Sequence, residues 1–280
     1  MAYEFELIRV EVDAGVAFAT IDNPPINVLT VPLFQELVRL SEELEADNDV
    51  RVFVLKSANP DFFIAHFDVQ ALLQSPIDGE AVRTEELGAY HLMCERYRTM
   101  PKATIAQIEG RVGGGGSELA SSFDMRFGVR GKTKINQMEV PLGILPGGTG
   151  TQRLPRLVGR GRALEIILAG DDLDAETAEK WGYLNRALYA DQIGPFVTSL
   201  ARRIASFPPE AVRLAKASVD AADMPLKEGL LEEAYLFQQL MRTDDAQRNM
   251  KRFLEIGGQT REGELEVNEL SRRLGLDQEG

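Results

Sequence analysis

Four consecutive glycines, Gly113–Gly116, lie between a predicted β-strand and a predicted helix, and they constrain the fold more than any other feature. The strand is an apolar run that closes at Gly110, and residues 117–120 (SELA) begin the helix. Because glycines lack Cβ atoms, a ligand can approach this backbone closely, and the helix directs its free N–H groups and positive dipole end at the same place. The run therefore predicts a site for an anion or a developing negative charge, or else a tight turn that packs the helix against the strand.

The elements on either side of the glycines follow a repeating order of strand, strand and helix. Alternating or continuous apolar runs predict the strands, apolar residues at helical spacing predict the helices, and Gly, Pro, Asn and Asp mark the turns. The predicted strands cover residues 5–12, 15–21, 50–56, 101–109, 125–129 and 132–136. The predicted helices cover residues 30–47, the second part of 57–74, 79–99 and segments between 151 and 169. This order predicts an α/β fold and differs from a strict β-α-β alternation.

From about Pro195 onward the pattern predicts helices only. One helix starts at Pro208 and ends near residue 222, a second covers 227–242, and a third is capped by Thr243 and ended by Gly257. The tail is charged and has weak helical character. We therefore expect three parts: a core of residues 1–194, a helical region of residues 195–261 and a charged extension of residues 262–280.

Composition and charge exclude several classes of protein. The chain has 31 Lys and Arg against 44 Asp and Glu, a net charge of −13, which disfavours nucleic acids and membranes as partners but not a small anionic ligand. Cys94 is the single cysteine, so no intrachain disulfide can form, and His66 and His91 do not have metal-ligand spacing. The N-terminus lacks a leader pattern, and no apolar run reaches about 18 residues. We therefore predict a cytoplasmic protein without a metal site.

Three familiar glycine motifs do not match the run. A dinucleotide fingerprint requires glycine where Glu118 or Leu119 stands, a P-loop requires a GK[ST] ending, and a nucleophile elbow around Ser117 lacks its last glycine. These mismatches leave acid–base chemistry by carboxylates as the leading option.

Glu118 and Glu139 are the carboxylates beside glycine-rich backbone. Glu118 lies in the first turn after the glycines, and Glu139 directly precedes the segment 140–143 (VPLG). Two carboxylates that converge on one site can act as acid and base, because like charges in a confined space separate their pKa values. On spacing alone the simpler interpretation is favoured, in which Glu118 interacts with the helix dipole and Glu139 is a solvated charge at a strand end.

Three segments resemble the crotonase, or enoyl-CoA hydratase/isomerase, superfamily. They are IEGRVGGGGSELASSFDMR, which is similar to the second oxyanion loop of the family, EVPLGILPGGTGTQRLPRLVG and DLDAETAEKWGYLNRAL. The likeness extends from about Phe5 to Glu255. It implies a crotonase-like ββα spiral core with a C-terminal helical region that forms a homotrimer or a dimer of trimers. It also implies an acyl-CoA substrate and no cofactor other than the coenzyme A of that substrate.

The resemblance assigns roles to individual residues. The backbone N–H groups of Phe67 and Gly115 would form the oxyanion hole that holds the thioester oxygen, and loss of one such donor costs ~3 kcal/mol of transition-state stabilisation. Glu139 would donate a proton to the α-carbon, and Glu118 would act as the base toward the added water. Further substrate or coenzyme A contacts would come from Ala65, His66, Asp68, Val69, Gly114, Leu142 and Gly147.

The sequence departs from the family pattern at residues 65–68, which read AHFD instead of A-G-A-D. His66 must therefore adopt the backbone conformation that the glycine allowed, and its ring either projects into the acyl pocket or packs elsewhere. Gln70 stands where a basic residue often meets a coenzyme A phosphate. Arg111, Lys102 and Arg153 are candidates for that contact, although a solvated position is the simpler interpretation for each.

We therefore predict an enoyl-CoA hydratase that adds water to a 2-enoyl-CoA through an enolate. Another crotonase reaction stays open: double-bond isomerisation, aryl hydration with cleavage, decarboxylation or thioester hydrolysis. A non-catalytic acyl-CoA binder is a third possibility, against which the two retained glutamates argue. A nicotinamide dehydrogenase is disfavoured by the failed fingerprint.

Overall fold

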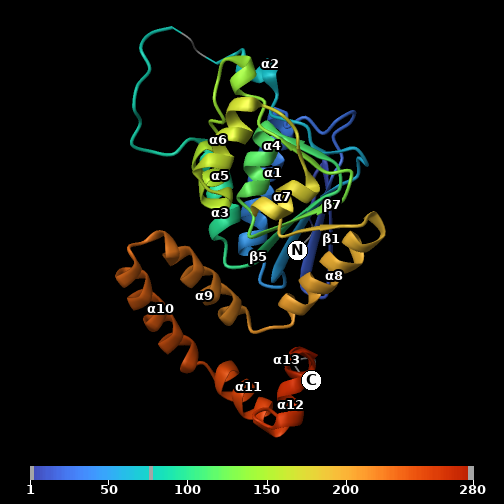
Figure 1. The fold of residues 1–280 in the computed structure, drawn as a ribbon, viewed down its shortest axis with the longest axis vertical. Coiled ribbons are helices and arrows are strands. Elements are labelled where there is room, and N and C mark those ends of the chain that lie inside the picture. Colours follow the sequence, from blue (N-terminus) through green and yellow to red (C-terminus); the bar gives the residue numbers. More distant parts are fainter. Residues whose placement is uncertain (1–2, 76–77, 277–280) are drawn as a thin grey trace.

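The computed structural model describes residues 3–75 and 78–276, and its larger sheet has six strands (Figure 1). In spatial order these strands are β1 (Ile8–Asp13), β2 (Val16–Ile21), β3 (Val52–Ser57), β5 (Ala103–Ile108), β7 (Met125–Val129) and β10 (Arg186–Leu188). The first two pair antiparallel, and every other neighbouring pair is parallel. All the strands predicted between residues 5 and 129 are therefore found, with shifts of a few residues at their ends.

A smaller sheet contains the strands that alternate with those of the larger one. Its order is β4 (Phe62–Ile64), β6 (Arg111–Gly113), β8 (Lys134–Asn136) and β9 (Leu173–Asp174). In each of the pairs β3–β4, β5–β6 and β7–β8, the first strand joins the large sheet and the second joins the small one. The expected order of strand, strand and helix is thus a ββα spiral, but β4 and β6 lie where the sequence predicted loop.

The helices of the core surround these sheets. They are α1 (Val31–Ala46), α2 (Val69–Leu72), α3 (Ala89–Thr99), α4 (Gly114–Ser121), the 3₁₀ turn η1 (Val140–Leu142), α5 (Gly150–Val158), α6 (Arg160–Ala169), α7 (Ala175–Trp181) and α8 (Ala190–Ala205). The prediction of helix over 79–88 was wrong, because these residues are solvent-exposed and offer no apolar face to pack. Figure 1 shows this stretch as part of a loop that projects from the core.

Strand β3 shows how the core is divided. Val52 and Val54 point to one face and pack with α8, whereas Phe53 and Leu55 point to the other face and join the main core. Because successive side chains of a strand face opposite sides, a strand that is buried on both faces must be apolar throughout. This confirms the buried strand predicted from the sequence VRVFVLK.

The C-terminal helices form an arm that extends from the core and turns back toward it (Figure 1). They are α9 (Pro209–Asp220), η2 (Ala221–Asp223), α10 (Leu226–Met241), α11 (Asp244–Glu255), α12 (Arg261–Leu265) and α13 (Val267–Leu276). Thr243 caps α11, as predicted. The Arg203 side chain donates a hydrogen bond to Asn268 Oδ1 (3.0 Å), which links α8 to α13. Helix α8 crosses residue 194, and the division of the chain into three parts stays a prediction.

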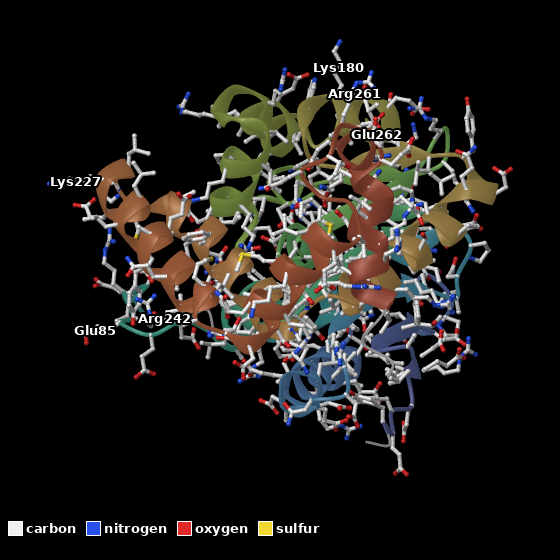
Figure 2. The ribbon with its side chains drawn as sticks, turned by 90° about the horizontal axis from the view of Figure 1, so that it is seen from below. Glu85, Lys180, Lys227, Arg242, Arg261 and Glu262 are labelled. Carbon is white, nitrogen blue, oxygen red and sulfur yellow. The ribbon has the colours of Figure 1, made fainter. Side chains whose placement is uncertain are left out.

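Helix α10 exposes large apolar side chains. Leu226, Leu231 and Phe237 are 78%, 62% and 61% exposed, respectively. Figure 2 shows Lys227 and Arg242, from the two ends of this helix, at the outer edge of the molecule. In the described part of the chain, no helix combines the length and the apolar character needed to cross a membrane.

Candidate active site

The glycine run lets α4 pack directly against the small sheet. A Cβ at Gly116 would lie 2.7 Å from the Ile64 side chain, and a Cβ at Gly113 would lie 2.5 Å from the Ala65 carbonyl oxygen. Both positions therefore require glycine for packing. The helix begins at Gly114, three residues before the predicted start. Gly114, Gly115 and Gly116 therefore belong to its first turn.

The carboxylate of Glu118 is held by backbone N–H groups. Its Oε1 atom accepts hydrogen bonds from the N–H groups of Gly148 (2.8 Å), Thr149 (2.9 Å) and Gly150 (2.8 Å). These residues lead into α5, so the positive end of that helix faces the carboxylate. Glu118 is 5% exposed, and this anchor fixes one of its oxygens inside the protein.

Glu139 has a different environment. It is 8% exposed, and its buried Oε2 atom has no hydrogen-bond partner. Burial, followed by the negative charge of Glu118, raises the pKa of Glu139 to about 7. A Cβ at Gly114 would lie 3.1 Å from Glu139 Oε1, so this glycine makes room for the carboxyl group. The two glutamates thus offer one anchored carboxylate and one carboxyl group that can hold a proton near neutral pH.

Both glutamates border a cavity of about 320 Å³ with mostly apolar walls. Its lining consists of Phe67, Leu72, Tyr90, Gly115, Glu118, Glu139, Ile144, Leu145, Gly147 and Gly148. Larger cavities beside β1 and against α9 are lined by neither glutamate and by neither of the predicted oxyanion donors. A small apolar cavity with two convergent polar groups is the usual form of a ligand site.

Phe67 and Gly115, the residues of the two predicted oxyanion donors, both line this cavity. Gly115 is the second residue of α4, so its N–H has no acceptor within the helix. The Leu29 N–H donates to the His66 carbonyl (2.8 Å), and the Leu29 carbonyl accepts from the Asp68 N–H (3.1 Å). Because both neighbours of Phe67 bond to Leu29, the N–H of Phe67 points away from Leu29. The Phe67 nitrogen lies 3.5 Å from the position of a Cβ at Gly115. The structure therefore brings the two predicted oxyanion donors together.

His66 does not have the backbone conformation expected at a glycine position. Among the described non-glycine residues, positive φ angles occur at Ala14, Asn27 and Gln259 and not at His66. Its Nδ1 atom lies 2.8 Å from the Phe67 carbonyl oxygen, and its ring does not line the cavity. Of the two interpretations, packing outside the acyl pocket agrees with this geometry.

Other predicted contact residues lie near the cavity without lining it. Asp68 caps α2 by accepting a hydrogen bond from the N–H of Gln70 (2.9 Å), and Val69 begins that helix. Leu142 is 51% exposed in η1. Ala65 packs behind Gly113, and Gly114 lies between His66 and Glu139. Gly147 is the predicted contact residue of this set that lines the cavity.

Tyr90 is a site residue that the sequence analysis missed. Its hydroxyl donates a hydrogen bond to the Gly115 carbonyl (2.5 Å), and its ring stacks on Phe34 and meets Phe67 edge-on. Tyr90 shares a helix face with the buried Cys94, a pattern that indicates core packing. Its contact with Gly115 arises only from folding. Leu72, Ile144, Leu145 and Gly148 were missed for the same reason.

The three candidates for a phosphate contact are engaged within the protein. Arg111 forms a two-point ion pair with Asp172 (2.5 and 2.6 Å). Lys102 is buried and donates to two backbone carbonyls, and Arg153 pairs with Glu95. The interpretation of Lys102 and Arg153 as solvated side chains was therefore wrong, since Lys102 is 6% exposed and the Arg153 side chain 13%.

Metal ligands and a reactive thiol find no support in the geometry. Within residues 3–75 and 78–276, no group of three or more His, Cys, Asp or Glu residues could hold a metal ion. Cys94 is buried, and burial raises the pKa of its thiol to about 12.

Comparisons with known proteins agree with the resemblance. A family model described as "Enoyl-CoA hydratase/isomerase" matches residues 11–262. A Mycobacterium leprae protein named "Probable enoyl-CoA hydratase" is 31% identical over 254 residues, which cover 90% of this chain and 96% of that protein. The short-chain-enoyl-CoA hydratase of Clostridium acetobutylicum is 30% identical over 255 residues, which cover 90% and 96%. The solved structure of an enoyl-CoA hydratase subunit of Geobacillus kaustophilus aligns with a TM-score of 0.83 at 32% identity, covering 92% of this chain and 98% of that one.

Proposed function

Because the chain belongs to the enoyl-CoA hydratase/isomerase family, we propose that it adds water across the 2,3 double bond of a 2-enoyl-CoA thioester. The observation that carries this proposal is the pair of glutamates at one cavity, with one carboxylate anchored and the other carboxyl group able to hold a proton. Acid and base at a single site are what the addition of water to an activated double bond requires.

The thioester oxygen would bind between the N–H groups of Phe67 and Gly115. As the oxygen of water bonds to C3, negative charge moves through the double bond onto the thioester oxygen and forms an enolate. Hydrogen bonds from the two N–H groups and the positive end of α4 stabilise that charge. Their benefit is greatest in the transition state, where the charge develops.

The two carboxyl groups would divide the proton transfers. Glu118 accepts a proton from the attacking water through the oxygen that the backbone does not hold, and protonated Glu139 delivers a proton to C2 of the enolate. The product gains one water, and exchange with solvent returns both glutamates to their starting states. The pKa of about 7 suits Glu139 to this task, because the carboxyl group then keeps its proton near neutral pH.

The proposed reaction uses coenzyme A only as the handle of the substrate and requires neither a metal nor a redox cofactor. We further propose a cytoplasmic location, which the single buried Cys94 supports, since disulfides are typical of oxidising compartments.

The experiment is to mix purified protein with 2-enoyl-CoAs that carry short, long and aryl acyl groups. We expect the enoyl-thioester absorbance to fall and the product mass to rise by one water. Glu118→Gln and Glu139→Gln should each lower turnover by about 100-fold or more, whereas Glu165→Gln, a control at an exposed position of α6, should not. Wild-type turnover in both site variants would refute the proposal. An unchanged product mass would favour isomerisation, and binding without turnover would favour an acyl-CoA binder.

We also propose that the protein forms a homotrimer or a dimer of trimers. The exposed apolar side chains of α10 support an interface on the C-terminal arm. Light scattering after gel filtration should give three or six times the monomer mass, and Phe237→Glu should lower it. A monomer at micromolar concentration would contradict this proposal.

A further inference from the structure

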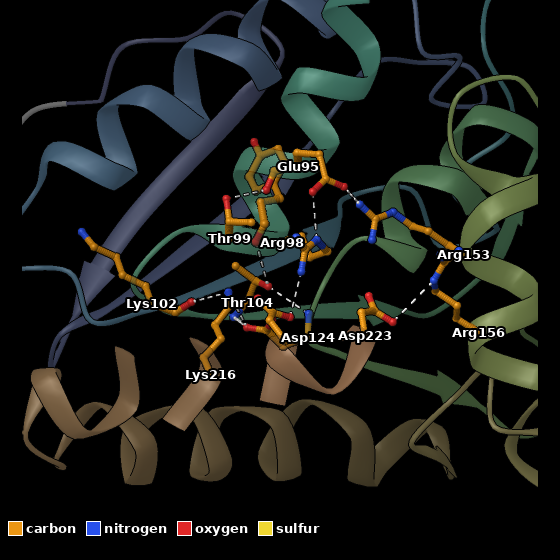
Figure 3. A network of polar contacts seen from close by, with 12 residues as sticks. Glu95, Arg98, Thr99, Lys102, Thr104, Asp124, Arg153, Arg156, Lys216 and Asp223 are labelled. Carbon is orange, nitrogen blue, oxygen red and sulfur yellow. Dashed lines mark hydrogen bonds and ion pairs between the residues drawn. The ribbon is translucent and has the colours of Figure 1, made fainter. Parts of the chain in front are cut away.

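Helix α5 both anchors Glu118 and carries an ion pair to another helix. The N–H groups before its first turn hold the Glu118 carboxylate, and Arg153 follows one turn later. The Arg153 side chain is 13% exposed and pairs with Glu95 on α3. Figure 3 shows Glu95 between Arg153 and Arg98.

Glu95 is itself fixed in place. Its second oxygen accepts a hydrogen bond from Arg98 (3.0 Å), and Arg98 also pairs with Asp220 on α9 (2.8 Å). A carboxylate whose one oxygen is already held loses less side-chain freedom when its other oxygen binds a second group. The pair with Arg153 therefore joins α5 to a rigid neighbour.

The N-terminal end of α3 carries Tyr90, which lines the cavity. There the Tyr90 hydroxyl holds the carbonyl of Gly115, whose N–H is a proposed oxyanion donor. One ion pair thus connects the helix that anchors Glu118 to the helix that holds the Gly115 peptide.

We propose that the Arg153–Glu95 ion pair is a positioning element. It keeps the N-terminal end of α5, and with it the Glu118 carboxylate, at a fixed position relative to the Glu139 carboxyl group. The proposal rests on the hydratase function proposed above. The Arg153 side chain is 13% exposed and the Glu95 side chain 37%. Such a pair contributes little net stability, because desolvation of the buried partner and solvent screening of the exposed one offset its Coulomb energy, so a role in geometry accounts better for its cost.

The titration of Glu139 reports the position of Glu118. Glu118 and Glu139 line the same cavity, and the charge of Glu118 contributes, after burial, to the raised pKa of Glu139. Displacing the Glu118 carboxylate should lower that pKa. Loss of the positive charge of Arg153 without any movement would have the opposite sign, because removing a cation raises the pKa of a carboxyl group.

The test is carbon-13 NMR of protein labelled at its glutamate carboxyl groups, with the Glu139 signal assigned by its absence in Glu139→Gln. We expect the titration midpoint of Glu139 to be lower in Arg153→Met than in the wild type. Glu118→Gln, which removes the charge altogether, should lower the midpoint further and so defines the limit of the effect. Arg156→Met is the matched control, since Arg156 lies on the same helix and is 60% exposed, and its midpoint should equal that of the wild type. An unchanged or raised midpoint in Arg153→Met would overturn the proposal.

Kinetics on 2-enoyl-CoA supply a second measurement. We expect kcat of Arg153→Met to fall on the order of 10- to 100-fold with little change in KM, because small misplacements cost that much. Glu95→Gln should likewise lower kcat with little change in KM. The double variant Arg153→Met/Glu95→Gln should have a kcat no lower than that of Arg153→Met alone. If Arg153→Met fails to fold, the Glu139 midpoint in Glu95→Gln decides instead.

The two proposals can fail separately. If the wild type turns over no enoyl-CoA but the Glu139 midpoint falls in Arg153→Met, the function is wrong and the positioning role stands. If the wild type is active but the midpoint does not move, the positioning role is wrong.

Discussion

Replacing Gly148 by alanine should disturb the proposed active site although no catalytic residue is substituted. A Cβ at this position would lie 2.6 Å from Glu118 Oε2 and 2.7 Å from Tyr90 Cε1. Real Cβ atoms do not approach other atoms so closely, so both neighbours, or the backbone of residue 148 itself, must move. The contact with Glu118 is relieved only if the carboxylate or the residue 148 backbone moves, and either movement disturbs the anchor, because the Gly148 N–H donates to Glu118 Oε1.

The size of the effect follows from the hydrogen bonds that anchor Glu118. If the carboxylate moves by several tenths of an ångström, at least one of its three bonds to backbone N–H groups weakens. A hydrogen bond to a charged group contributes about 1.5–3 kcal/mol. Since about 1.4 kcal/mol corresponds to a tenfold change in rate, kcat/KM should fall roughly 10- to 150-fold.

The assay is hydration of a 2-enoyl-CoA, followed by absorbance, together with thermal unfolding. Gly161→Ala is the control, because it makes the same change in α6 at a position with nothing within 4 Å. This control should keep full activity and gain about 0.5–1 kcal/mol of stability, as expected for alanine in a helix. If kcat/KM of Gly148→Ala stays within about twofold of the wild type, the anchor does not control the position of Glu118 and the reasoning fails.

Three further predictions concern Glu139 and a helix cap. Because the pKa of Glu139 is about 7 in the folded protein and 4.5 in the reference state, its ionisation destabilises the fold progressively as pH rises from about 4.5 to 7. Glu139→Gln should therefore raise the unfolding free energy by about 1–3 kcal/mol at pH 8 and leave it unchanged at pH 4, as measured by urea denaturation; an equal effect at both pH values would contradict this. In the wild type, kcat/KM should decline above pH 7 as Glu139 loses its proton, and a flat profile to pH 9 would argue against Glu139 as the acid. Thr30→Ala removes the cap of α1, where the hydroxyl accepts from the N–H of Leu33, and should cost about 1 kcal/mol in the same denaturation experiment.

Features encoded by adjacent residues could be predicted from the sequence. Thr30 before an apolar helical pattern correctly marks the start of α1, and Thr243 does the same for α11. The uninterrupted apolar run of β3 correctly predicts burial on both faces. In each case the local chemistry, a hydroxyl cap or an apolar strand, agrees with the tertiary structure.

Features created by contacts between distant segments could not be predicted from the sequence. Strands β4 and β6 have three residues each, too few to show a period, and they exist only because β4 pairs with β6 and β6 pairs with β8. Tyr90 and Gly148 reach the cavity from helices and loops far apart in sequence.

The glutamates show what the resemblance contributed. Spacing alone favoured a solvated charge for Glu139, yet this residue is 8% exposed, and Glu118 is 5% exposed. The position of the Glu118 carboxylate depends on the segment that follows η1, because the N–H groups of residues 148–150 donate hydrogen bonds to it. The resemblance selected both residues, whereas their different environments became visible only in the folded chain.

The backbone anchor of Glu118 has a consequence for how mutations at residues 148–150 would be tolerated. Every amino acid except proline supplies a backbone N–H, so the bond from residue 149 to the Glu118 carboxylate requires no particular side chain. The Thr149 hydroxyl also donates to the Glu118 carbonyl (3.2 Å), and this residue is buried. At Gly148 and Gly150, by contrast, a Cβ would lie 2.6 Å from Glu118 and 2.7 Å from Pro146. In a saturation library over these three codons, active clones should therefore exclude larger residues at positions 148 and 150. At position 149 they should exclude proline and favour residues that fit the buried space of threonine.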